Sequence, residues 1–435
     1  MKRVMIYFSA MLTTIWLLVP FGVNATNGYF SHGYGVRYKA MAGSGVSLSF
    51  STLGAANNPA GLVHLGKRFD VGLAMFIPKR EFTVVGNPSG FPGTFGLAPG
   101  TVQSERNGFF IPSIGSNFMF NDKSSIGVSV YGNGGMNTRY PSSVFGGANP
   151  TGVDLTQLFV QTTYSRKLGE KHSVGISSIL AFQFFEATGL EAFANFSSDP
   201  SHLTAMGHDT SFGTGLKFGY MGEWTEGLRF GASYQMKLEM SQFDKYAGLF
   251  AGHGSFDIPA NWTVGLSYQM SDRWLMSFDV QQILYGGISS IANPLDPMAL
   301  PPAFPDGSGG FVPNPNQVGL GEAGASGFGW DDVMIYKFGT EFSGVEDWKF
   351  RAGFSLTEQP IPASEMIFNI LAPGVIEKHA TVGFSKAMGE KNELSFSLMH
   401  GFSNTISGPN MFEAPNQQTI ELTMHQWEFE VGFTF

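Results

Sequence analysis

The side chains of this sequence with the clearest chemical potential are basic residues within segments of alternating polarity. Lys237, Lys337 and Arg351 fall on the polar side of their segments. The same holds for Lys217, Arg229 and Arg273. A cation in such a position can hold a ligand carboxylate through a charge-assisted hydrogen bond. Alternatively, acids of the same face, such as Glu341 and Asp279, neutralise these cations without any ligand. Lys237, Lys337 and Arg351 are therefore candidates for a carboxylate-binding site.

Patterns typical of catalysis or cofactor binding are weak. Residues 319–324 match the spacing G-x-G-x-x-G, but they follow a Pro-Asn-Pro stretch rather than a strand. The chain has no Cys, which excludes thiolate metal sites and Cys nucleophiles. His202 and His208 form the closest His pair and fall in a loop-like stretch, where a metal site is not expected. Ser397 near His400 leaves a lipase-like enzyme as a minor alternative. We expect no enzyme, no cofactor and no metal.

The composition excludes several classes of protein. Only 14% of the 435 residues are charged, and 57 are Gly; an average soluble domain has about 25% charged residues and about 7% Gly. A hydrophobic content of 43% excludes a disordered chain. The formal net charge is −9 and no basic stripe occurs, so a nucleic-acid partner is not expected.

Residues 1–25 have the features of a secretory signal peptide. Lys2 and Arg3 precede an apolar stretch, and residues 23–25 read Val-Asn-Ala, with small residues where signal peptidase needs them. The alternative is an uncleaved membrane anchor. No later stretch offers the roughly 18 consecutive apolar residues of a spanning helix.

Residues 67–435 alternate between apolar and polar side chains with a period of two, which predicts β-strands. Trp274, Met276 and Phe278, for example, alternate with polar or charged neighbours. A soluble β-sandwich also alternates. However, the charged residues on the polar side, the aromatic residues near segment ends and the terminal Phe435 favour a transmembrane β-barrel.

Fourteen strands are expected, an even number as bacterial barrels require. They cover residues 67–79, 108–120, 124–134, 155–168, 172–185, 210–221, 227–240, 260–270, 273–285, 332–343, 348–358, 376–387, 392–402 and 420–435. The connections alternate between tight turns and long stretches, which predicts short periplasmic turns, long external loops and periplasmic termini. Residues 364–371 suit either a short loop helix or an extension of a strand.

Residues 26–66 do not alternate and are rich in Gly and other small residues. A barrel of fourteen strands leaves an interior too wide for its own side chains to fill. We therefore predict that 26–66 form a plug, or hatch, inside a barrel formed by 67–435. A flexible periplasmic tail is the alternative, which the low charge of the segment disfavours.

The third expected strand breaks into a stretch with Gly132, Gly134 and Gly135 within four positions. Gly weakens a regular strand and often marks a bulge, where ladder hydrogen bonds are lost. In a barrel wall this predicts an inward kink; an ordinary hairpin bend is the alternative.

The opening of the hatch, the Asn58-Pro59-Ala60 triplet and the Gly-broken third strand resemble the outer-membrane long-chain fatty acid transporter family (FadL type), which includes aromatic-hydrocarbon channels. The resemblance extends over residues 26–435. It implies a fourteen-stranded barrel blocked by a hatch, an internal binding pocket and lateral exit of cargo through the kinked wall. The implied hatch and gating residues are Asn27, Gly28, Tyr29, Phe30, Asn58, Pro59 and Ala60.

The expected function is passive uptake of hydrophobic molecules, either long-chain fatty acids or hydrocarbons, across the outer membrane of a Gram-negative bacterium. The expected partners are such a ligand, outer-membrane lipid and lipopolysaccharide, and the expected state is a monomer. The family's basic carboxylate-binding residues cannot be aligned with this chain. A general porin or structural barrel remains the main alternative, because it would share the strand pattern but would need an open lumen.

Overall fold

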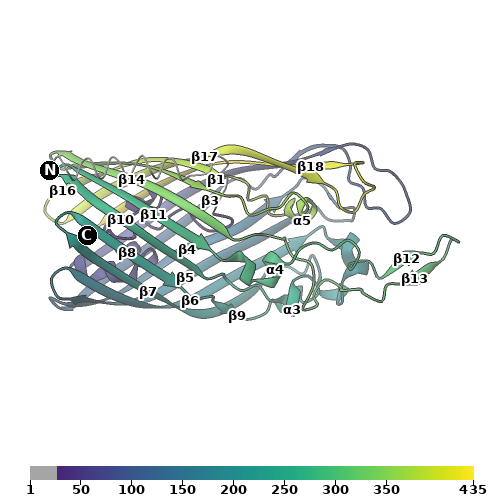
Figure 1. The fold of residues 1–435 in the computed structure, drawn as a ribbon, viewed down its shortest axis with the longest axis horizontal. Coiled ribbons are helices and arrows are strands. Elements are labelled where there is room, and N and C mark those ends of the chain that lie inside the picture. The colour runs from purple at the N-terminus through teal and green to yellow at the C-terminus, as the bar shows by residue number, and fades with distance from the viewer. Residues whose placement is uncertain (1–26) are drawn as a thin grey trace.

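The computed structural model describes residues 27–435, so the expected signal peptide lies outside the described residues. These residues form one closed antiparallel sheet, in which the last strand pairs with the first. The sheet has sixteen strands, of which β2 (Gly100–Gln103) and β9 (Glu239–Met240) are short additions. The other fourteen form the wall, which confirms the predicted barrel (Figure 1).

The wall strands follow each other in chain order around the barrel. They are β1 (Arg68–Val85), β3 (Phe109–Asn121), β4 (Ser124–Arg139), β5 (Gly152–Leu168), β6 (His172–Thr188), β7 (Asp209–Thr225), β8 (Leu228–Gln235), β10 (Asn261–Ser271), β11 (Trp274–Ile283), β14 (Val333–Val345), β15 (Trp348–Thr357), β16 (Lys378–Met388), β17 (Asn392–Pro409) and β18 (Thr419–Thr434).

The alternation of side chains fixes which face of each strand meets lipid. Along β11, Trp274 and Met276 are exposed, whereas Leu275, Ser277 and Asp279 point inward and are buried. The outward apolar side chains cover the wall, as a lipid-facing surface requires. Among residues 27–435, no helix is long and apolar enough to cross a bilayer.

Several strand boundaries differ from the expected ones. The third wall strand does not end near Gly134 but continues to Arg139, because its outer half pairs with β5. The expected strand 227–240 ends at Gln235, since residues 236–238 leave the ladder. β1 and β17 extend about six or seven residues further than expected, to Val85 and Pro409.

Turns at one end of the barrel are short, and loops at the other end are long (Figure 1). The long loops carry a hairpin of β12 (Ala303–Pro305) and β13 (Phe311–Pro313). They also carry the one-turn helices α3 (Ala251–Gly254), α4 (Ser289–Ala292) and α5 (Met366–Asn369). α5 lies within residues 364–371, so the helix alternative for that stretch is confirmed.

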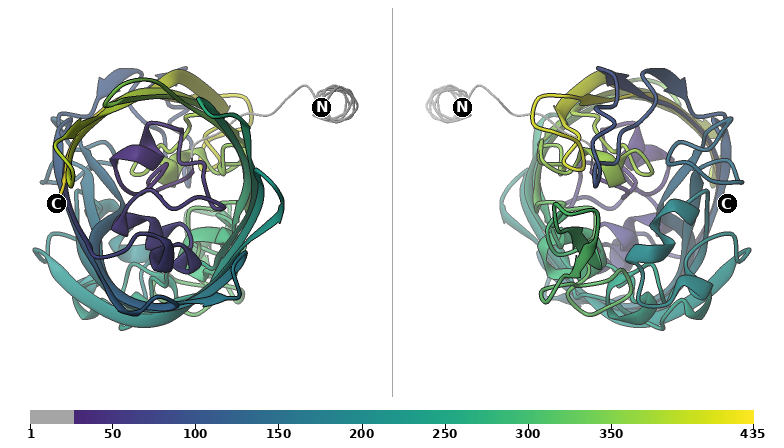
Figure 2. Two further views of the ribbon diagram at one scale, coloured as in Figure 1. Left: turned by 90° about the vertical axis from the view of Figure 1, so that its left-hand side faces the viewer. Right: turned by 90° about the vertical axis from the view of Figure 1, so that its right-hand side faces the viewer.

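Residues 27–66 lie inside the ring of strands, as both end views show (Figure 2). They contain α2 (Val36–Lys39) and the 3-10 helices η1 (Thr52–Ala56) and η2 (Pro59–His64). α2 contacts β16, β17 and β18, η1 contacts β3 and β4, and η2 contacts β5, β6 and β7. The segment therefore touches the wall on several sides.

Wall carboxylates hold the backbone of this segment. Asp279 on β11 accepts hydrogen bonds from the amides of Gly45 (2.7 Å) and Val46 (2.9 Å). Asp70 on β1 accepts one from the amide of Thr52 (2.8 Å). These contacts satisfy backbone donors that would otherwise be buried without a partner.

Candidate functional site

The barrel wall is interrupted between β3 and β4. The ladder between these strands ends at the pair Ile114–Val130, although β4 continues for nine more residues. Beyond Val130, β4 pairs only with β5 on the wall, with a register shift between Gly132 and Gly134. Residues 109–113 of β3 continue to pair with β1 on their other side. We call the resulting opening the β3–β4 gap.

The N-terminal segment takes the place of β3 beside the bulged part of β4. Phe30 forms an antiparallel bridge with Gly134. The amide of Gly135 donates to the carbonyl of Tyr29 (3.0 Å), and the amide of Ser31 donates to the carbonyl of Asn133 (2.9 Å). A Cβ at Gly134 would lie 1.9 Å from the Tyr29 carbonyl oxygen, so only Gly permits this approach. Backbone groups lost from the ladder are thereby paired within the protein, as a membrane wall demands.

The end of the gap nearest the long loops is closed by Arg80 and its neighbours. The Arg80 guanidinium donates to the carbonyls of Asn137 on β4 and Arg106 just before β3. The amide of Glu105 donates to the carbonyl of Arg139 (2.8 Å). The gap is therefore bounded at both ends, by these bonds and by the Ile114–Val130 pair. Arg80 is 7% exposed and satisfies two carbonyls that the missing ladder leaves unpaired.

A cavity of about 240 Å³ lies directly behind this gap. Gly132, Gly134 and Ile111 of the gap line it, so it reaches the wall opening. Its apolar part contains Tyr29, Phe30, Tyr34, Phe76, Phe109, Phe110, Tyr131, Met136, Trp330, Leu371 and Ala372. Mostly apolar walls with a few polar groups are typical of small-molecule sites.

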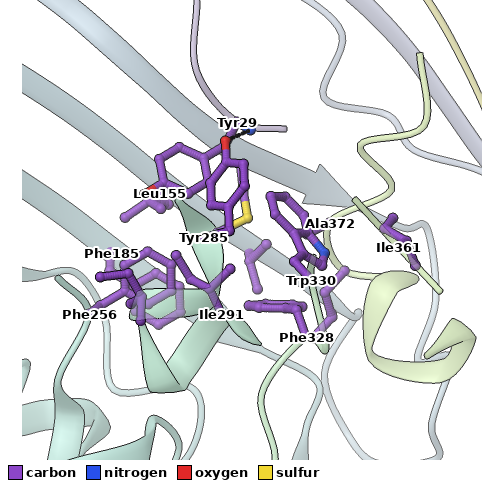
Figure 3. Close-up of a cluster of buried hydrophobic side chains, with 14 of the residues drawn as sticks. Tyr29, Leu155, Phe185, Phe256, Tyr285, Ile291, Phe328, Trp330, Ile361 and Ala372 are labelled. Atoms are coloured by element: carbon purple, nitrogen blue, oxygen red, sulfur yellow. Dashed lines mark hydrogen bonds between the residues drawn. The ribbon is translucent and has the colours of Figure 1, made fainter. Parts of the chain in front are cut away.

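Tyr29 joins the cavity to a large apolar cluster beneath the long loops (Figure 3). Its ring centroid lies 5.4 Å from that of Tyr285 and 6.1 Å from that of Trp330. The Tyr285 hydroxyl donates to the carbonyl of Asn27 (2.6 Å) and accepts from the amide of Tyr29 (3.2 Å). Gly28 has a φ of 60°, and a Cβ there would lie 2.3 Å from the Tyr285 oxygen. These contacts with Tyr285 thus fix the start of the N-terminal segment beside the cavity.

The opposite part of the cavity is polar. Lys39 of α2 places its Nζ atom 2.5 Å from Glu428 Oε1 and 2.8 Å from Glu430 Oε2, both on β18. All three residues are at least 94% buried and line the cavity. Burial alone would lower the pKa of the Lys39 amine, but the two carboxylates outweigh this and raise it. The amine therefore stays protonated between two acids.

This polar part also contains His32, His379 and Gln426. We call the six residues together the polar floor: His32, Lys39, His379, Gln426, Glu428 and Glu430. The imidazoles of His32 and His379 stack with their centroids 6.0 Å apart. Burial, aided by the nearby cations Lys39 and Lys337, lowers the pKa of His32 well below its usual range, so this imidazole is neutral. Its Nε2 atom has no hydrogen-bond partner among residues 27–435.

Asn58, Pro59 and Ala60 lie far from the gap, against β5, β6 and β7. The Asn58 amide nitrogen donates to the carbonyls of Val46 (2.7 Å) and Tyr220 (2.9 Å), and its oxygen caps η2 at the Ala60 amide (3.0 Å). Gly219 permits this contact, because a Cβ there would lie 2.0 Å from the Asn58 oxygen. The structure therefore separates residues 58–60 from residues 27–30, which border the cavity.

Replacing Asn58 with Ala removes these three hydrogen bonds and leaves buried carbonyls unpaired, at a cost of roughly 1–3 kcal/mol for each group. We expect the closed barrel to persist while η2 detaches from the wall more often. Limited proteolysis of the folded protein should then cut within residues 27–66 faster than in the parent. Asn316→Ala, on an exposed loop, is the matched control, and equal cleavage of both variants would contradict this role of Asn58.

The three basic candidates for a ligand carboxylate do not line the cavity. Lys237 lies on the outer surface and pairs with Asp257 (2.9 Å). Lys337 is buried and donates to the carbonyl of His32 (3.3 Å). Arg351 is buried and pairs with Glu341 (2.6 Å). Arg351 thus follows the alternative in which a lumen acid neutralises the cation.

The minor catalytic and metal alternatives also lack a formed site. Ser397 is buried on the inner face of β17, whereas the His400 ring lies 4.1 Å from the outward ring of Trp427, so the two cannot act as a pair. His202 bonds to Asp199, while His208 contacts Asp154 and Glu186. Within residues 27–435, no group of three or more His, Cys, Asp or Glu side chains could hold a metal ion.

Sequence reasoning missed Arg80 and the polar floor. Glu428 and Glu430 occupy the polar side of the last strand, and this alternation was the available signal. Their partner Lys39 lies in a segment without alternation, so no pattern in the sequence connects it with β18.

The closed barrel of fourteen antiparallel strands with apolar outward side chains defines an outer-membrane β-barrel protein. A family model described as outer membrane protein transport protein (OMPP1/FadL/TodX) matches residues 27–426, and the chain therefore belongs to that family of outer-membrane transport proteins. A comparison with curated protein sequences gives no match.

Solved structures with the same fold include two toluene transporters and a FadL homologue. TodX of Pseudomonas putida is 17% identical, with a TM-score of 0.64 over 93% of this chain and 98% of that one. The FadL homologue of Pseudomonas aeruginosa is 15% identical, with a TM-score of 0.66 over 94% and 99%. TbuX of Ralstonia pickettii is 17% identical, with a TM-score of 0.60 over 93% and 98%. At these identities the likeness concerns the fold.

Proposed function

We propose that this chain carries small apolar molecules passively from the outside into the outer membrane. Cargo enters between the apolar long loops, occupies the cavity behind the β3–β4 gap and leaves sideways through the gap into the bilayer. The similar solved structures include toluene transporters and a FadL homologue, which supports an apolar cargo. Such a route avoids the charged outer leaflet, which hinders apolar solutes.

The observation that carries this proposal is the continuity of the cavity with the interrupted wall. The cavity is lined by Ile111 on one edge of the gap and by Gly132 and Gly134 on the other. The ladder that would close the wall at this level is absent between β3 and β4. At this level, no β3–β4 ladder separates an apolar molecule in the cavity from the hydrocarbon layer.

We also propose that residues 27–66 act as the hatch, with residues 67–435 as the barrel. Asn27, Gly28, Tyr29 and Phe30 would gate the cavity, since they form its inner wall. Asn58, Pro59 and Ala60 would anchor the hatch, since Asn58 bonds to β7 and Ala60 bonds to β5. A general porin would need a continuous water path past this segment, and the many contacts of residues 27–66 with the wall disfavour it.

Filling the cavity should block transport without harming the barrel. Met136 on β4 lines the cavity and is 7% exposed, so Met136→Trp places an indole in the space for cargo. We expect uptake of radiolabelled toluene by cells that depend on this channel to fall several-fold. Met276→Trp is the matched control, because Met276 faces lipid on β11. Unchanged uptake through correctly assembled Met136→Trp would count against the cavity as the route.

A further inference from the structure

The polar floor carries an unequal number of charges. A single ammonium, that of Lys39, lies between the carboxylates of Glu428 and Glu430. The neutral His32 imidazole adds no charge. The floor therefore has one more acidic side chain than basic side chains. In a site shielded from water, these acidic side chains act strongly on any ligand group that approaches them.

The floor also offers unused hydrogen-bonding capacity. Each carboxylate can accept several hydrogen bonds, and Lys39 supplies only one contact to each of them. The Nε2 atom of His32, a residue that is 5% exposed, lines the same cavity without a partner among the described residues. The floor therefore has carboxylate oxygens that can accept further hydrogen bonds. It also has one neutral nitrogen, His32 Nε2, that can form one.

From this arrangement we propose that the site selects uncharged apolar molecules that carry one hydroxyl group, of the phenol or alcohol class, and disfavours carboxylates. The ligand hydroxyl donates to Glu428 or Glu430, while its apolar body lies among the aromatic side chains near the gap. A ligand carboxylate has no proton to donate and would lie beside two acidic side chains. The proposal rests on the proposed transport function and specifies its cargo.

Arg80 is the competing site for an anion, since it is a cation at the other end of the cavity. Its guanidinium, however, already donates to the carbonyls of Asn137 and Arg106 that border the gap. A carboxylate at Arg80 would have to displace these bonds and leave the carbonyls unpaired. The structure therefore favours selection by the polar floor.

Three ligands that share a methylphenyl body test this selection: 4-methylphenol, toluene and 4-methylbenzoate. Binding to the full mature protein in lipid nanodiscs is measured by equilibrium dialysis, with empty nanodiscs as the blank for partition into lipid. Because toluene cannot make the hydrogen bond to a charged group, we expect 4-methylphenol to bind about tenfold or more tightly than toluene. We expect 4-methylbenzoate to bind more weakly than either.

Glu428→Gln removes one of the two acidic side chains but leaves the Lys39–Glu430 ion pair, so the floor stays paired in the variant. We expect 4-methylbenzoate to gain about tenfold in affinity there, the equivalent of 1.4 kcal/mol. Glu430→Gln keeps the Lys39–Glu428 pair and should give the same gain in affinity for 4-methylbenzoate. It replaces the first variant in the test if Glu428→Gln does not assemble. Glu421→Gln, whose side chain points outward on the same strand, is the matched control.

Two results would overturn the selection by the floor. One is 4-methylbenzoate binding at least as tightly as 4-methylphenol to the parent, which would point to Arg80. The other is an equal affinity for 4-methylphenol and toluene. In either case toluene binding would leave the proposed function intact. Absence of binding and of uptake for all three ligands would instead refute the proposed function itself.

Discussion

Deletion of residues 27–66 should turn a barrel that conducts almost no ions into one with discrete open-channel currents. The segment lies inside the ring of strands and contacts β3 to β7 and β16 to β18 through α2, η1 and η2. Without it, the charged lumen side chains Asp279, Lys217 and Lys337 face water instead of the buried backbone. The apolar cluster beneath the loops also loses Tyr29 and Phe30, which pack against Tyr285.

Single-channel recording in planar bilayers measures this effect. The variant that lacks residues 27–66 should first be shown to form a folded barrel, by a heat-dependent shift in its electrophoretic mobility. Asn58→Ala is an informative comparison, because it should weaken the anchor of η2 and still leave the segment in place. If the parent and the deleted protein conduct alike, residues 27–66 do not block the lumen, and the porin alternative regains support.

The barrel could be predicted because its cause is local. Each wall strand must present apolar side chains to lipid and polar ones to the lumen, and this requirement leaves a period of two in the sequence. Boundaries were less accurate where pairing with a neighbour decides them. β4 continues past its Gly residues because β5 supplies partners as far as Arg139, and nothing local to residues 132–139 indicates those partners.

The site was harder to predict, because it depends on contacts between distant segments. Lys237 fits the polar side of its segment, yet the strand ends at Gln235 and the following residues leave the ladder, so the parity argument fails there. Lys39 meets Glu428 and Glu430 only because α2 lies against the inner face of the last strands. Arg80 bonds to carbonyls that are free only because β3 and β4 do not pair at this level. No pattern in the sequence indicates where two strands fail to pair.

The Gly residues of β4 were noticed in the sequence, but the structure distinguishes their roles. At Gly134 a side chain would collide with the Tyr29 carbonyl and displace the N-terminal segment. At Gly135 it would meet the carbonyl of Leu155 on β5 at 2.3 Å and disturb the ladder. At Gly132 it would meet only Ile111 Cγ2 as a close neighbour, at 2.9 Å across the gap. Gly132 is therefore the position at which the gap can be filled with the least disturbance of the hatch.

Gly132→Leu should abolish most release of cargo into the membrane while leaving entry into the cavity intact. The φ angle of Gly132 is not positive, so an L-residue can adopt this backbone conformation. The leucine side chain then fills the space between β4 and Ile111, at the level where the wall has no ladder. We expect uptake of toluene by cells to fall more than with the cavity-filling Met136→Trp, because every molecule must pass this point.

Binding distinguishes a closed exit from a damaged site. Gly132 lines one edge of the cavity, so the affinity of purified Gly132→Leu for toluene in nanodiscs should fall, but by much less than uptake, since the cavity walls at Tyr29, Met136 and Trp330 are unchanged. Gly287→Leu is the matched control, because a Cβ there meets no atom within 4 Å and its φ is not positive either. Undiminished uptake through assembled Gly132→Leu would exclude the β3–β4 gap as the exit, since no cargo could then depend on an opening that the leucine occupies.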